Sequence, residues 1–171
     1  GMVEKIGDKD SKLHLSYNGN TLVFEKQTND HEQAMDIILE SIANSEFGII
    51  DNISDIDAVG HRVVHGGEEF TGSVVINDKV IASIEKFADL APLHNPPNLT
   101  GIKAAQHSLP YAMQVACFDT SFHATIPQVA YMYALPYELY EKYCIRRYGF
   151  HGTSHKYVTN RAAALLGKEV N

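Results

Sequence analysis

The chain has 171 residues, of which 44% are hydrophobic and 20% are charged, and its formal net charge is −7. This length and composition are typical of a globular protein with one domain's worth of core. The net charge argues against a general nucleic-acid binder and against a protein of anionic membrane surfaces, because both need a cationic face. It does not exclude an anionic substrate, since the local field of a site can oppose the net charge.

The sequence carries no targeting or membrane segment that we can identify. No apolar run is long enough to span a membrane, and no signal-peptide core stands near the N-terminus. Cys117 and Cys144 lack the spacing of a metal site, so we expect buried free thiols in a cytoplasmic protein. Gly1 before Met2 is interpreted as a remnant of tag removal, and the expected domain covers residues 2–171.

The N-terminal part of the chain predicts a hairpin followed by a helix. Residues 12–24 alternate apolar and polar side chains around Asn18-Gly19, a pair that favours the positive-φ turn of a β-hairpin. Residues 29–42 have the period of an amphipathic helix, with Asn29 as the expected N-cap. The apolar face of this helix is expected to hold Ala34, Ile37, Ile38 and Ile42.

The rest of the chain alternates predicted strands and helices. Strands are expected at residues 56–64, 74–76, 113–118 and 145–148. Helices are expected at residues 78–88, from near Pro97 to His107, at 137–143 and at 154–166, the last one closed by Gly167. Residues 113–118 form a near-continuous apolar run, which is typical of a strand covered on both faces. The alternation indicates an α/β fold in which helices flank a sheet.

Polar residues and glycines gather in four segments, each beside a predicted strand end or a glycine turn. These segments are residues 61–68, 93–98, 118–123 and 149–155. In open α/β sheets, ligands bind at the carboxyl ends of the strands. The four segments therefore indicate one ligand site.

Two charged residues stand out against apolar surroundings. Arg62 lies within a predicted strand, where it forms either a structural ion pair or a fork of donors that grips a carboxylate or phosphate. The glycines that follow it permit close backbone approach and favour the second interpretation. Asp119 follows a predicted strand and is either an N-cap or a metal ligand, nucleophile or general base. If the two converge, they suit an anionic substrate.

The nine histidines raise the alternative of a metal site. His61 and His65 are four residues apart, but on a strand this spacing is not that of a helical zinc pair. Gly152 breaks the helix that His151 and His155 would need. No metal site is therefore predicted within the chain, and a metal-dependent hydrolase ranks last among the function classes. The pair Arg146-Arg147 is interpreted as surface charge.

At this point four segments together resemble the signatures of the acetate kinase family, in the family's order. They are Gly60-His61-Arg62-Val63-Val64-His65-Gly66-Gly67, Pro92-Leu93-His94-Asn95-Pro96-Pro97-Asn98, Cys117-Phe118-Asp119-Thr120-Ser121-Phe122-His123 and Tyr148-Gly149-Phe150-His151-Gly152-Thr153-Ser154-His155. The resemblance extends from about Val3 onward. Because this family belongs to the sugar kinase, Hsp70 and actin superfold, it implies a mixed sheet flanked by helices in a truncated ribonuclease H-like domain.

The resemblance implies a reversible transfer of the γ-phosphoryl group of ATP to acetate, with Mg²⁺, giving acetyl phosphate and ADP. Arg62 would hold the carboxylate or the phosphoryl group, Asp119 would orient substrate or metal, and His151 would hydrogen-bond the phosphoryl group in the transition state. The pocket for the acetate methyl group would be lined by Val64, Leu93 and Phe150, with His94 as a supporting residue.

The chain also departs from the family pattern. Members begin with a strand pair that carries an Asn-Ala-Gly-Ser-Ser-Ser-Leu-Lys phosphate turn, and their second half carries the adenosine site; neither stands in these residues. We therefore expect a partial N-terminal, acetate-binding domain that lacks the first strands and most of the ATP site, and that is inactive alone. The resemblance implies a homodimer for the full-length enzyme.

Two alternatives to acetate kinase remain open. A propionate kinase would differ in the volume of the acyl pocket, and Val64 favours acetate because a smaller residue would admit a longer chain. A non-catalytic binding domain of the same superfold is the second alternative, since a fold alone does not fix function. The clustering of Arg62, Asp119 and His151 argues against it.

Overall fold

The structure, a computed structural model, describes residues 1–44 and 46–170. The predicted domain also includes Ser45 and Asn171, which lie outside the described residues. The chain divides into two compact units: unit 1 comprises Gly1–Val59 and Thr100–Gln114, and unit 2 comprises Gly60–Leu99 and Val115–Asn171. None of the helices in the described part of the chain combines the length and the apolar character needed to cross a bilayer.

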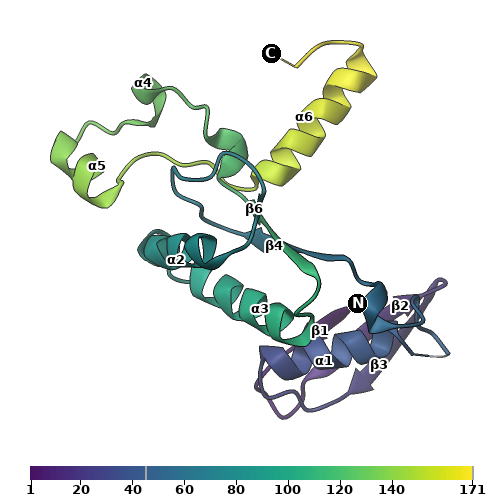
Figure 1. Cartoon of the computed structure of the whole chain (residues 1–171). Coiled ribbons are helices and arrows are strands. Elements are labelled where there is room, and N and C mark those ends of the chain that lie inside the picture. Colours follow the sequence, from purple (N-terminus) through teal and green to yellow (C-terminus); the bar gives the residue numbers. More distant parts are fainter. Residues whose placement is uncertain (45, 171) are drawn as a thin grey trace. The chain divides into compact units, whose positions relative to one another are not determined.

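Unit 1 contains a small antiparallel sheet made by β1 (Met2–Glu4), β2 (Lys12–Tyr17) and β3 (Asn20–Glu25), in that order (Figure 1). The predicted hairpin is confirmed, because Tyr17 pairs with Asn20 across a two-residue turn. Asn18 and Gly19 have φ values of 47° and 79°, as a type I′ turn requires. Strand β1 was not predicted, since three residues are too few to show a period.

The predicted helix of unit 1 is α1 (His31–Ile42). Its N-cap is Asp30, whose side chain accepts a hydrogen bond from the Gln33 amide, so the prediction of Asn29 was wrong by one residue. Both residue types cap helices well, and the sequence does not rank them. The core of the unit is formed by buried Leu39, Leu109 and Ala112, with Met35, Ile42, Ile53, Ile56 and Val59 packed against them.

The second sheet is mixed, as predicted, and consists of β4 (Ala58–Val63), β6 (Met113–Phe118) and β5 (Val74–Val75), in that order. Strand β5 is antiparallel to β6. The Met113 amide donates to the Asp57 carbonyl, and the Asp119 amide donates to the Val63 carbonyl. This constant offset shows that β4 and β6 are parallel. The predicted cover on both faces of β6 was wrong, because Gln114, Ala116 and Phe118 are buried whereas Met113 is 55% exposed.

The helices predicted for the rest of the chain are all present, although most of them begin or end at other residues than predicted. They are α2 (Asp78–Lys86), continued by the 3₁₀ turn η2 (Phe87–Leu90), then α3 (Asn95–Ser108), α4 (Gln128–Tyr131), α5 (Tyr137–Tyr143) and α6 (Gly152–Leu166). Helix α3 begins at Asn95 rather than near Pro97, because prolines fit the first turn, where their missing amide hydrogen is not needed. Helix α5 has the predicted bounds, and Gly167 closes α6 with φ 61°.

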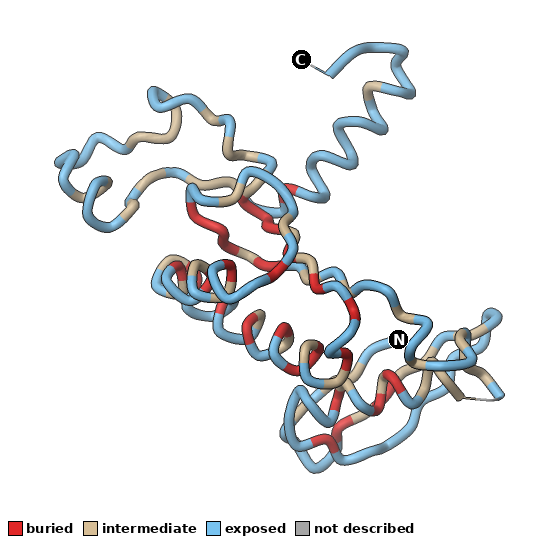
Figure 2. Tube along the Cα trace, viewed as in Figure 1, coloured by how far each residue is buried: buried red, intermediate tan, exposed pale blue. Residues whose placement is uncertain are grey.

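The core of unit 2 is formed by residues of β4, β6, α2, η2, the start of α3 and their connections. Buried apolar residues are Val63, Ile76, Val80, Ile84, Phe87, Ala91, Leu99, Ala116 and Phe118. Figure 2 shows that α6 and the segment with α4 and α5 are mostly exposed. Both cysteines are free, as expected, but they are half-buried rather than buried.

Two predictions fail in the segment before α6. Residues 145–148 form no strand. Arg146 is not a surface charge: its side chain is 6% exposed, pairs with Glu68 and lies 3.5 Å above the centroid of the Tyr131 ring. A cation over an aromatic face is stabilised by the ring quadrupole. Arg146 therefore ties this segment to the glycine turn after β4.

Candidate functional site

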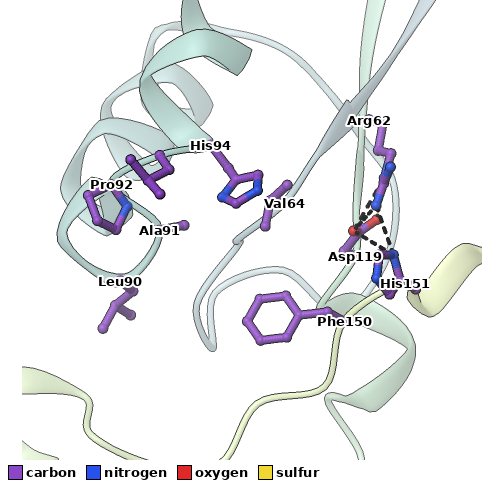
Figure 3. A pocket seen from close by; sticks show the side chains of 10 residues that line it. Arg62, Val64, Leu90, Ala91, Pro92, His94, Asp119, Phe150 and His151 are labelled. Carbon is purple, nitrogen blue, oxygen red and sulfur yellow. Dashed lines mark hydrogen bonds and ion pairs between the residues drawn. The ribbon is translucent and has the colours of Figure 1, made fainter.

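A cleft of about 670 Å³ lies in unit 2, and Figure 3 shows the side chains around it. All seven site residues named from the sequence line this cleft: Arg62, Val64, Leu93, His94, Asp119, Phe150 and His151. Leu90, Ala91 and Pro92 also line it and were not predicted as site residues. They lie in η2 and in the turn between η2 and α3, beyond residue 88, where the preceding helix was predicted to end.

The charged side of the cleft is built by the ends of β4 and β6. These neighbouring parallel strands bring Arg62 and Asp119 together. Arg62 Nε donates to Asp119 Oδ1 at 3.0 Å, and Arg62 Nη2 donates to Oδ2 at 2.7 Å. The Asp119 side chain is 3% exposed, whereas that of Arg62 is 63% exposed. The buried carboxylate thus fixes the plane of a guanidinium group that remains accessible from the cleft.

The structure bears on both alternatives left open by the sequence. Asp119 is not an N-cap, because the 3₁₀ turn η3 (Ser121–His123) is preceded by Thr120 and has no side-chain cap. Arg62 does form an ion pair, but with Asp119 and at the cleft. This pairing, chiefly the hydrogen bond to Asp119, raises the pKa of Arg62 above its ordinary value. The site therefore keeps a permanent cation.

His151 completes the polar cluster from the turn that precedes α6. Its Nδ1 lies 2.9 Å from Nη2 of Arg62 and 3.8 Å from Oδ2 of Asp119. Because a guanidinium group only donates, Nδ1 must accept, and the proton of a neutral His151 ring sits on Nε2. The residue has a left-handed φ of 52°, and the next amide, Gly152 N, donates to the Asp119 carbonyl at 2.9 Å.

Val64, on the apolar side of the cleft, directly follows β4. Two asparagines of α3 hydrogen-bond to the backbone of Val64 and His65, much as a neighbouring strand would. Asn98 Oδ1 accepts from the Val64 amide at 3.0 Å. Asn95, fully buried, accepts from the His65 amide at 3.1 Å and donates to the His65 carbonyl at 3.0 Å. Its amide also donates to the Ile84 carbonyl at 3.1 Å. Both asparagines were in a polar segment, but no role was predicted for them.

His65 lies behind the cleft and is buried among aromatic rings. Its ring centroid is 4.5 Å from that of Tyr148, 5.5 Å from Phe150 and 6.2 Å from Phe87. Burial lowers the pKa of His65 to about 4, so the ring is neutral near pH 7. Its Nδ1 accepts from the Gly67 amide at 3.0 Å. His65 thus supports Phe150 from behind and shapes the glycine turn.

A second cleft of about 700 Å³ shares Arg62, Asp119 and His151 with the first. Its other lining residues are Gly60, His61, Cys117, Thr153, Ser154 and Tyr157. The charged cluster therefore stands between two open spaces, the first also lined by Val64 and Phe150 and the second by Cys117 and Tyr157. Such an arrangement allows one anionic group on each side of the guanidinium.

The described residues fit an anion better than a metal ion of their own. No group of three or more His, Cys, Asp or Glu side chains in the described part of the chain is placed to hold a metal. Mg²⁺ on nucleotide phosphates needs only one or two protein carboxylates, because it keeps waters and phosphate oxygens as ligands. Asp119 is the carboxylate of this cleft that fits such a role, although both its oxygens contact Arg62.

The sequence is similar to that of known proteins over nearly its whole length. The model of the acetokinase family matches residues 1–171. The chain is 53% identical to the acetate kinase of Clostridium acetobutylicum and 54% identical to that of Thermotoga maritima, each over 170 residues. These matches cover 99% of this chain and 42% of each relative. The chain thus spans less than half the length of these relatives.

Solved structures give the same result for the fold. The acetate kinase of Porphyromonas gingivalis aligns with a TM-score of 0.91 at 48% identity, over 98% of this chain and 42% of that one. A propionate kinase from Francisella tularensis aligns with a TM-score of 0.90 at 38% identity, with the same coverage. The α/β fold predicted from the sequence is therefore confirmed.

Proposed function

Because the chain belongs to the acetokinase family, we propose that it is the partial N-terminal, acetate-binding domain, residues 2–171, of an acetate kinase. The reaction is the reversible transfer of the ATP γ-phosphoryl group to acetate, giving acetyl phosphate and ADP. The observation that carries this proposal is the first cleft, in which Arg62, Asp119 and His151 face an apolar wall of Val64, Leu93 and Phe150. We also propose that the full-length enzyme is cytoplasmic and forms a homodimer.

A short carboxylate such as acetate needs hydrogen-bond donors at its charged end and apolar contact at the other. Arg62 carries five N–H donors, and Asp119 and His151 engage only those on Nε and Nη2. The remaining donors serve the carboxylate of acetate. Its methyl group packs against Val64, Phe150 and Leu93, which line the same cleft. His94, directly before α3, supports this wall.

Phosphoryl transfer to a carboxylate requires alignment and charge neutralisation, with little covalent work by the protein. Acetate is already ionised at neutral pH, so no general base is needed. We place acetate in the first cleft and the phosphoryl donor in the second, so that Arg62 neutralises charge on both sides. His151 donates from Nε2 to a phosphoryl oxygen, and Asp119 holds the guanidinium in place.

ATP and Mg²⁺ are the expected donor and metal, and they supply the phosphoryl group and the neutralisation of its phosphate charges. Of the residues described here, Asp119 is the one that fits a contact with the metal. The contribution of this chain is to bind and orient the acceptor. The adenosine site is assigned to the part of the enzyme that the relatives have and these residues do not cover.

Propionate kinase is the second candidate, because a protein with that name shares the fold at a TM-score of 0.90. One methylene group in an apolar pocket changes the free energy by only about 1–3 kcal/mol, so both acids are expected to react. Val64, a branched side chain at the wall, favours the shorter acid.

The test is acetyl phosphate formation, trapped with hydroxylamine, by the product of the complete reading frame that encodes this chain. Activity with ATP, Mg²⁺ and acetate is expected, with a lower kcat/KM for propionate. The 171-residue chain alone, as the matched control, is expected to give no turnover but to bind acetate by ligand-observed NMR. A folded full-length product that binds acetate and forms no acetyl phosphate would instead indicate a binding domain. Light scattering on the same sample measures the oligomeric state.

A further inference from the structure

We propose that His123 is a positioning residue that fixes the turn of residues 149–152 and thereby sets the acyl-chain preference of the cleft. The inference rests on the proposed function, since it concerns the acceptor acid. His123 does not line the cleft of about 670 Å³. It acts instead through Phe150 and His151, which do.

The first observation is a hydrogen bond to the backbone of the apolar wall. His123 Nε2 lies 3.0 Å from the Phe150 carbonyl oxygen. Because a carbonyl only accepts, Nε2 must carry a proton and donate. His123 ends η3, which begins two residues after Asp119. The same short segment therefore supplies the buried carboxylate of the charged cluster and the anchor of the apolar wall.

The second observation is the absence of a side chain at Gly149. A Cβ atom at this position would lie 2.2 Å from Cγ of the His123 ring. The φ of Gly149 is outside the left-handed region, so the requirement for glycine is steric and arises from the imidazole ring. The ring of His123 thus packs directly on the backbone at residue 149.

The third observation is that the turn is held at further points on both sides of a strained residue. His151 has a φ of 52°, a strained conformation for a non-glycine residue that persists only where neighbours impose it. The Gly152 amide is fixed by the Asp119 carbonyl, and Nδ1 of His151 is fixed by Arg62. On the Phe150 side, His123 anchors the backbone, and the ring of His65 packs against the Phe150 ring. Its loss would free the aromatic wall and the imidazole together.

The experiment uses the full-length product and measures kcat and KM for acetate and for propionate. The variants are H123A, H123Q, G149A and the double variant H123A/G149A. His31→Gln, an exposed histidine in α1, is the matched control. In H123A, kcat/KM for acetate should fall about tenfold, as expected for the loss of one hydrogen bond at a positioned group. The acetate-to-propionate ratio should fall at least about threefold, because a loosened wall admits the longer acid.

The remaining variants separate positioning from simple destabilisation. The amide of Gln in H123Q reaches as far as Nε2 and should restore most of the preference. G149A alone should lower kcat/KM for acetate and the acetate-to-propionate ratio as H123A does. In the double variant it should change these values by less than about twofold beyond H123A, because the ring that its methyl group would meet is gone. A destabilising role alone would lower kcat for both acids equally, with KM and their ratio unchanged, and that result overturns the inference. An inactive wild-type enzyme refutes the proposed function; an active one whose preference is unaltered by H123A refutes only the role of His123.

Discussion

The buried ring of His65 makes the stability of the chain depend on pH in a defined window. Its pKa is lowered to about 4 by burial, compared with about 6.5 for a histidine in water. Between these two values the unfolded chain binds a proton at this residue and the folded chain does not. Lowering the pH therefore favours the unfolded state, and the stability present above pH 6.5 is lost as the pH falls toward 4.

The magnitude follows from the size of the shift. A pKa difference of about 2.5 corresponds to a maximum of about 3.4 kcal/mol, reached below pH 4. Between pH 7 and pH 5 the loss attributable to His65 is about 2 kcal/mol. This is a large part of the 5–15 kcal/mol that typically separates folded from unfolded domains.

The assay is urea unfolding of the 171-residue chain and of His65→Asn at pH 7 and pH 5. Asn keeps an acceptor near the position of Nδ1 for the Gly67 amide, and it does not titrate. The free energy of unfolding should fall more steeply with acid in the wild type, by about 2 kcal/mol. An NMR titration of the His65 ring in the wild-type chain provides the value directly. Equal pH dependence in the two proteins, or a ring that titrates near 6.5, would refute the reasoning.

Three further predictions concern the cleft. Arg62→Lys in the full-length enzyme should lower kcat/KM for acetate at least about 100-fold, as initial rates at several acetate concentrations would show. A lysine ammonium group is a point charge, so it cannot reproduce the two-point contact with Asp119 or hold the substrate as the planar guanidinium does. Val64→Ala should shift the acetate-to-propionate ratio of kcat/KM toward propionate by about three- to tenfold, as competition between the two acids would show. Asn95→Ala should destabilise the chain by about 3 kcal/mol or more in urea, since three buried backbone groups lose their partners, whereas Asn98→Ala, which removes one half-buried bond, should cost about 1 kcal/mol.

The features that could be predicted from the sequence are those set by local pattern. The period of two and the pair Asn18-Gly19 suffice for a hairpin, because both strands and their turn lie within 14 residues of each other. Asp119 directly follows an apolar strand-like run, and Arg62 lies near the end of another. Parallel neighbouring strands bring such ends to one edge of a sheet, so their meeting follows from topology without knowledge of side-chain packing.

The features that could not be predicted depend on partners far away in the chain. Arg146 has the charge of a surface residue, and only the fold places it over Tyr131 and beside Glu68. Residues 145–148 contain side chains with high β propensity, but Tyr148 packs on His65 and the segment joins no sheet. The anchoring role of His123 depends on a turn 26 to 29 residues later, which no local pattern indicates.

Each of the four polar segments divides its residues between the cleft and its support. In the first, Arg62 and Val64 line the cleft while His65 packs behind it. In the later segments the supporting residues are Asn95 and Asn98, then His123, and finally the glycines at positions 149 and 152, which admit a close ring and a close carbonyl. Precision at a site that acts by alignment requires such support, because displacement by about 1 Å can cost about 100-fold in rate. It follows that a polar residue in a signature segment is not by itself evidence of substrate contact. Substitution of a supporting residue should alter selectivity and KM through the wall that it holds, whereas substitution of Arg62 should remove the proposed contact with the carboxylate itself.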